Sequence, residues 1–124
     1  IDEEEDKNLI RNGNDLIYNL LIPISTAIEG GEVEIPTITG RARIKVEPGT
    51  QPGKILRLRN KGLPEVNTGG SVMGDLLVNV NVFIPRTLND EERKLVSSIK
   101  GMQGFKPTES DRAGLDRKYR DMLR

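Results

Sequence analysis

The sequence predicts a mostly-β fold: a small two-sheet β-sandwich-like domain with one short helical turn, followed by C-terminal α-helices. Two observations predict it. Apolar residues alternate with charged or polar ones in several short runs, each ended by Gly or Pro, and this period of two is typical of half-buried strands. Towards the C-terminus the apolar spacing becomes helical, and strands followed by helices favour two small sheets packed face to face.

The 124 residues divide into three expected parts. Residues 1–6 are an acidic stretch, which we interpret as the end of a preceding domain or a linker. Residues 7–87 form the β-domain, and residues 88–124 form a helical segment. Because the chain begins at Ile1 rather than at Met, we expect a fragment or a processed form.

The first long strand is expected at Leu16–Ile22, directly after a turn at Asn12–Asp15, where Asn and Gly tolerate positive φ. Apolar residues lie on both of its faces, which predicts a strand covered on both sides. Pro23 ends this strand. Residues 25–29 can form one helical turn, which the Gly-Gly pair after them would stop.

Alternation predicts four more strands, at Val33–Ile35, Arg41–Glu47, Lys54–Arg59 and Leu76–Ile84. A tight turn is expected at Thr39-Gly40, between the first two of these strands. A Gly-rich loop at residues 67–71 precedes the last strand, which Pro85 ends. Each strand therefore has a stop signal that local backbone chemistry supplies.

Two helices are expected after the strands. Asn89 caps the first, with Glu92 three residues on as in a capping box, and Gly101 ends it. Its short apolar stripe is Leu95, Val96 and Ile99. Thr108 caps the second helix, which Gly114 weakens. Its apolar stripe is Leu115, Tyr119, Met122 and Leu123.

The composition excludes several classes of function. Hydrophobic residues make up 35% of the chain and aromatic residues 3%, which predicts a thin aliphatic core. Nineteen basic residues balance nineteen acidic ones, so nothing favours nucleic-acid binding. No Cys or His is present, which excludes disulfides, zinc–thiolate sites and the commonest general base. No apolar run is long enough to span a bilayer, and a Cys-free chain fits a cytoplasmic location.

No motif in the chain supports catalysis, and we expect no enzyme. The stretch Gly49–Ile55 resembles a phosphate-binding loop, but its glycines are too close together and no Ser or Thr follows the Lys. Asp75 stands alone before a strand, and the serines have no His to activate them.

Basic residues alternate along two of the expected strands: Arg41, Arg43, Lys45, Arg57, Arg59 and Lys61. If these strands are neighbours, the charges form one positive face. A solvated outer face of a sheet is the favoured interpretation. The alternative is a docking surface for an acidic peptide or partner.

Several short motifs occur in an order that resembles the DnaJ-type J-domain co-chaperones. The motifs are Gly30–Thr37, Gly40-Arg41, Glu47–Lys54, Leu58–Pro64 and Gly74–Leu76. They resemble the second C-terminal β-domain of that family, and the likeness covers about residues 7–100. Most members of the family have Gly where Asn60 stands here, which predicts a slightly altered turn.

The resemblance implies that unfolded client polypeptides bind as an added strand beside Gly31–Pro36. The implied peptide-binding residues are Gly31, Val33, Glu34 and Ile35. It further implies a homodimer formed through the first C-terminal helix. The implied dimer residues are Leu95, Val96, Ile99 and Phe105.

The resemblance also implies a role in delivering clients to a DnaK-type chaperone, as part of the stress response. The His-Pro-Asp motif of the J-domain and the zinc-binding cysteine modules are not found in these residues, so we expect no cofactor here; zinc would belong to the cysteine modules. No nucleic acid and no membrane is expected as a partner. A purely structural role, in which the domain spaces and dimerises the chaperone without binding a client, is the alternative.

Overall fold

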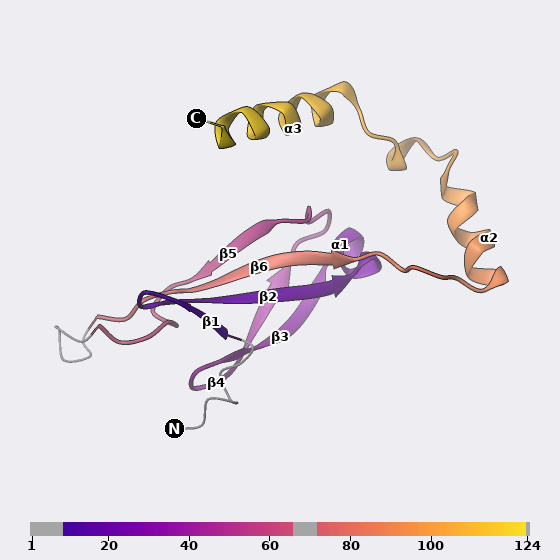
Figure 1. The fold of residues 1–124 in the computed structure, drawn as a ribbon. Helices are drawn as coiled ribbons and strands as arrows, with labels where there is room; N and C mark the ends of the chain where they lie inside the picture. The colour runs from indigo at the N-terminus through magenta and orange to yellow at the C-terminus, as the bar shows by residue number, and fades with distance from the viewer. Residues whose placement is uncertain (1–8, 66–71, 124) are drawn as a thin grey trace. The chain divides into compact units, whose positions relative to one another are not determined.

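The computed structural model describes residues 9–65 and 72–123 (Figure 1). The expected acidic stretch at residues 1–6 and the Gly-rich loop at residues 67–71 lie outside the described residues. The chain forms two compact units, Ile1–Ile84 and Pro85–Arg124. The first unit holds the strands and the second holds the two long helices, which confirms the predicted mostly-β fold with C-terminal helices.

The larger sheet has four strands in the order β1-β2-β6-β5. Their bounds are Leu9–Asn12 for β1, Asp15–Pro23 for β2, Leu76–Phe83 for β6 and Lys54–Leu58 for β5. Strands β2 and β6 run parallel, whereas β1–β2 and β5–β6 are antiparallel. All five predicted strands match the observed ones within two residues at each end, and strand β1 was not predicted.

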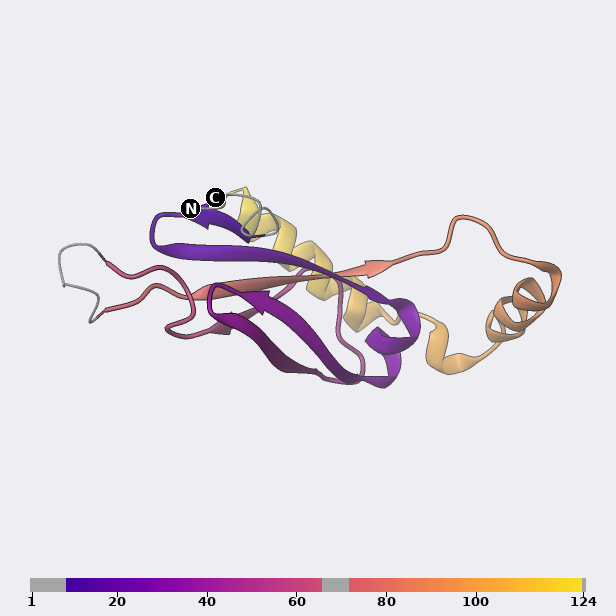
Figure 2. The same cartoon turned by 90° about the horizontal axis from the view of Figure 1, so that it is seen from below.

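The smaller sheet is a hairpin of β3 (Gly31–Thr37) and β4 (Gly40–Val46). The short helix α1 (Ile24–Glu29) leads from β2 into this hairpin. Figures 1 and 2 show the hairpin on one face of the larger sheet. The described strands of the two sheets share no ladder hydrogen bonds, so side-chain packing is the main contact between the sheets.

One aliphatic core lies between the two sheets. Alternate residues of β2 and β6 point into it, and Ile35, Ile44 and Val46 meet them from the hairpin. The buried residues are Leu9, Leu16, Leu20, Ile22, Ala27, Ile35, Ile44, Val46, Leu76, Val78 and Val80. Burying an aliphatic side chain of this size contributes about 1.5–3 kcal/mol to folding.

The outer face of the larger sheet is open among the described residues. Leu21 of β2 is 61% exposed and Ile10 of β1 is 51% exposed. The prediction that the first long strand is covered on both sides is therefore wrong. The physical reason is that the hairpin, the only other sheet among the described residues, covers the inner face. The outer face instead carries the polar residues Asn19 and Asn79, whose side chains are hydrogen-bonded at 3.1 Å.

Two glycines allow the backbones at one end of the larger sheet to approach closely. The Leu63 amide donates to the Asn14 carbonyl at 2.8 Å, and the Gly62 amide donates to the Gly74 carbonyl at 2.9 Å. A Cβ on Gly74 would lie 2.0 Å from the Asn14 carbonyl oxygen, and one on Gly62 would lie 2.6 Å from the same atom. This end of the sheet therefore has no room for a larger residue.

Asp75 joins three segments at the same end. Its carboxylate accepts hydrogen bonds from the Asn60 amide at 3.0 Å and from the Arg57 guanidinium, and its own amide donates to Asp15 Oδ1 at 2.7 Å. Asn60 has φ +64°, the left-handed conformation that a Gly would also adopt there. The turn therefore uses a conformation open to either residue, and Asp75, which stands alone in the sequence, is a structural link.

These hydrogen bonds set the charge state of Asp75. The amide hydrogen bond from Asn60, followed by the Arg57 guanidinium, lowers the pKa of the Asp75 carboxyl below its ordinary value of 3.8. Folding therefore favours the ionised carboxylate.

The second unit holds α2 (Asp90–Ile99), the short 3₁₀ helix η3 (Gln103–Phe105) and α3 (Glu109–Met122). Both predicted capping residues are confirmed. The Asn89 side chain accepts from the Glu92 amide at 2.7 Å, and the Thr108 hydroxyl accepts from the Asp111 amide at 3.2 Å. Neither long helix has a buried side chain among the described residues.

The Gly74→Ala variant tests the close backbone approach. We expect it to lower the free energy of unfolding by about 1–3 kcal/mol, because the added methyl group overlaps a backbone carbonyl that cannot move independently. Denaturant unfolding of the β-domain measures the change. Gly101→Ala is the matched control, since nothing lies within 4 Å of its added Cβ, and it should leave this transition unchanged.

The Asp75→Asn variant tests the lowered pKa. A depressed folded-state pKa stabilises the protein above the ordinary pKa of 3.8, and this stabilisation is lost as the pH falls through the folded-state pKa. The unfolding free energy of the variant should therefore depend less steeply on pH below about pH 4. Parallel curves for the two proteins in acid would contradict this account of the carboxylate.

Candidate functional site

Strand β3 is an edge strand. It pairs with β4 on one side, and no described strand pairs with its other side. Alternate backbone N–H and C=O groups of such a strand point away from its sheet and can accept another strand. Pro36 lies within β3, and Pro is found in strands mainly at sheet edges, because it has no N–H to donate.

The start of β3 is fixed by the turn before it. Gly30 has φ +82°, and a Cβ there would lie 2.8 Å from the Val46 carbonyl oxygen. The amides of Gly49 and Thr50 donate to the Ala27 carbonyl at the end of α1, at 2.9 and 3.0 Å. The Gly-Gly pair and the Pro-Gly turn therefore lock α1 and the hairpin together, and this holds the edge in place.

The four residues expected to bind peptide lie on both faces of β3. Ile35 is 0% exposed and belongs to the core, and Val33 is half-buried on the same inner face. Gly31 is exposed at the beginning of the strand, and Glu34 is exposed on the outer face. Of these four residues, Val33 is the one whose apolar side chain is partly accessible.

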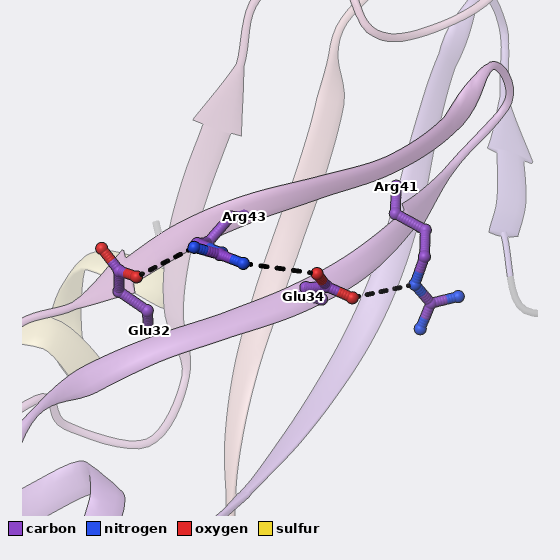
Figure 3. Close-up of polar contacts among 4 residues, drawn as sticks. All are labelled: Glu32, Glu34, Arg41 and Arg43. Carbon is purple, nitrogen blue, oxygen red and sulfur yellow. Dashed lines mark hydrogen bonds and ion pairs between the residues drawn. The ribbon is translucent and has the colours of Figure 1, made fainter.

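Ion pairs cover the outer face of the hairpin (Figure 3). Arg43 lies between Glu32 and Glu34, at 3.7 Å from each carboxylate. Arg41 Nε donates to Glu34 Oε1 at 3.2 Å. Lys45 lies 4.0 Å from Glu47. Acidic residues thus neutralise most of the basic alternation of β4.

The single positive face suggested by the sequence does not form from neighbouring strands. Strand β4 lies in the hairpin, whereas β5 is at the edge of the larger sheet. The condition for such a face, that the two strands are neighbours, is not met, because β6 pairs with β5 and β4 pairs with β3 among the described residues. The two sets of cations are therefore separate features.

The residues expected at a dimer interface lie in the second unit. Leu95 and Val96 of α2 are exposed, Ile99 is half-buried, and Phe105 is exposed in η3 rather than in α2. Helix α3 also leaves its apolar stripe exposed. Each helix therefore presents apolar side chains that the described residues of this unit do not cover.

Side chains for metal binding do not gather within residues 9–65 and 72–123. No group of three or more His, Cys, Asp or Glu side chains there could hold a metal ion. None of the helices in this described part is long and apolar enough to cross a membrane.

These features define a small two-sheet β-domain with one exposed hairpin edge and a helical extension. The DnaJ C terminal domain family model matches residues 1–85, and the chain belongs to this family. The family is one of co-chaperone domains rather than of enzymes, and the resemblance inferred from the sequence motifs is confirmed.

The similar proteins are named chaperone protein DnaJ. The chain is 59% identical over 123 residues to the protein of this name from Porphyromonas gingivalis, and the match covers 99% of this chain and 32% of the relative. It is 50% identical to that of Bacteroides fragilis, over 99% of this chain and 31% of the relative. It is 40% identical to that of Salinibacter ruber, over 86% of this chain and 27% of the relative. The chain thus spans about a third of the length of the curated relatives it matches.

Proposed function

We propose that this chain binds unfolded client polypeptides and forms a homodimer, as the C-terminal module of a DnaJ-like co-chaperone. The observation that carries the proposal is the exposed edge of β3, a strand held firmly by its turn and by the core beneath it. In the full-length protein, we infer delivery of clients to a DnaK-type chaperone in the cytoplasm. Membership of the DnaJ family supports this inference.

The affinity expected for strand addition is moderate, which suits a co-chaperone that must release its client. Each backbone hydrogen bond to an added strand contributes about 0.5–1.5 kcal/mol net. A buried client Leu or Ile beside Val33 adds about 1.5–3 kcal/mol. Ordering the client and losing its free motion cost several kcal/mol. The balance is near micromolar affinity, about −8 kcal/mol.

A purely structural role is the second candidate, and one observation favours it. Ile35, which the family resemblance places at the client site, is 0% exposed, and ion pairs occupy the outer face of the same strand. A client would therefore have to bind mainly through the backbone edge and Val33. In the structural role the domain spaces and dimerises the chaperone, and no peptide binds.

The Val33→Lys variant separates the two candidates. A short extended apolar peptide should shift the backbone amide signals of residues 31–36 in the wild type, and the variant should weaken binding at least tenfold, because the lysine places a charge beside the added strand. Nuclear magnetic resonance titration measures both effects. Ala42→Lys is the matched control, a half-buried residue on the same inner face but on β4, and it should keep binding.

Peptide-induced shifts confined to α2 and α3 would contradict the edge assignment. Equal loss of binding in the Val33→Lys and Ala42→Lys variants would also contradict it, because a general disturbance of the hairpin would then explain the loss.

The Leu95→Asp variant tests the dimer. Light scattering should show a dimer for the wild type and a monomer for the variant, because a carboxylate in an apolar helix contact carries a large desolvation cost. Leu115→Asp, an equally exposed leucine on α3, is the control and should stay dimeric. The client-binding hypothesis further predicts that the Leu95→Asp monomer still binds peptide. A monomeric wild-type chain would contradict the dimer assignment.

A further inference from the structure

Strand β5 forms a second exposed edge in the β-domain. It ends the strand order β1-β2-β6-β5, so one of its sides has no described partner strand. Ile55 of β5 is 53% exposed on the outer face of the sheet, and Leu56 and Leu58 are half-buried against the core on the inner face. This edge therefore offers both backbone groups and apolar side chains.

The positive charge at this edge is only partly compensated by the described residues. Strand β5 and the turn after it carry Lys54, Arg57, Arg59 and Lys61. Asp75 pairs with Arg57, whose side chain stays 51% exposed, and no other carboxylate of the described residues lies within ion-pair distance of these cations. Arg59 also acts on Asp75, since its charge helps to lower the pKa of that carboxyl. One acidic residue thus faces four basic ones.

The hairpin provides the contrast within the same domain. Its cations Arg41 and Arg43 each lie within ion-pair distance of a glutamate on the neighbouring strand. The cations of β5 have no acidic partner strand among the described residues, where β6 is the one strand paired with β5. The basic side chains of β5 therefore favour an added strand that carries acidic residues.

Side chains directly opposite on paired strands interact, and like charges there are destabilising. A second copy of β5 would bring its own Arg57 and Arg59 onto the same face beside these cations, so self-association through this edge is disfavoured by like charge. An added strand gains favourable contacts on both faces if its carboxylates lie opposite these cations and its apolar residues lie opposite Leu56 and Leu58.

We propose that the β5 edge is a second peptide site, which binds an extended acidic segment whose Glu or Asp residues alternate with apolar ones. It is distinct from the β3 edge, since the cations of that hairpin, Arg41 and Arg43 on β4, are already paired with glutamates of β3, and it does not depend on client binding there. The added strand extends the larger sheet. Its carboxylates lie by Arg57 and Arg59, and its apolar residues continue the core past Leu56 and Leu58.

The test uses the whole chain and two short end-blocked peptides, in which valine alternates with glutamate or with lysine. The glutamate peptide should bind and slow amide hydrogen exchange in residues 54–58, and the lysine peptide should not. The Arg59→Gln/Lys61→Gln variant should weaken binding by about 1.4-fold to 5-fold per cation removed, the range for exposed charge pairs. Arg41→Gln, which removes the same kind of charge from β4, should leave the affinity unchanged.

Three results would overturn the proposal. The first is binding of the glutamate peptide that the Arg59→Gln/Lys61→Gln variant leaves unchanged. The second is protection from exchange in β3 rather than in β5. The third is equal displacement by a single-stranded oligonucleotide with no protection of the β5 amides, which would mark a general polyanion patch. The glutamate peptide differs from the apolar peptide used for β3. The experiments can therefore contradict one proposed site and still support the other.

Discussion

The packing of the β3–β4 hairpin on the larger sheet is the interaction on which the rest of the structure depends. Ile35, Ile44 and Val46 meet the alternate apolar residues of β2 and β6 in a single core. No ladder hydrogen bond between described strands joins the two sheets, so side-chain burial holds the hairpin there, together with the hydrogen bonds of the Gly49 and Thr50 amides to α1. The outer edge of β3 is consequently left without a partner among the described strands.

The turns at the ends of the strands determine where the exposed edge of β3 lies. Gly30, with its positive φ, brings β3 under the end of α1, and Gly74 allows the turn before β6 to press against Asn14. Asp75 then links the beginning of β6 to β5 and to the Asn60 turn. Close backbone contacts and hydrogen bonds thus constrain both ends of the sheets. A rigid edge loses little conformational entropy when a flexible segment pairs with it, which favours binding by strand addition.

Much of the fold could be predicted from local sequence because Gly and Pro mark where each strand stops. Alternation also assigned Val33 and Ile35 to one face of β3 and Glu32 and Glu34 to the other. Strand β1 was missed because a single residue of it, Leu9, is buried, which leaves no alternation to detect. The capping boxes were readable because each depends on residues three positions apart.

Pairing between distant strands could not be predicted in the same way. Strands β2 and β6 pair in parallel although Leu16 and Leu76 are far apart in the chain, and the choice depends on the whole core rather than on either strand. For the same reason the sequence left open whether the cations of β4 and β5 share one face, and the structure puts them in separate sheets. The depth of Ile35 also depends on sheet packing, so the sequence identified the strand of the candidate site better than its exposed residues.

The most direct test of client binding at β3 is the set of intermolecular nuclear Overhauser effects between a bound extended apolar peptide and the chain. We expect close contacts between peptide Hα protons and backbone protons of residues 31–37, in the ladder pattern of paired strands. Contacts to the helices alone, or a bound peptide with no backbone contacts to β3, would contradict it.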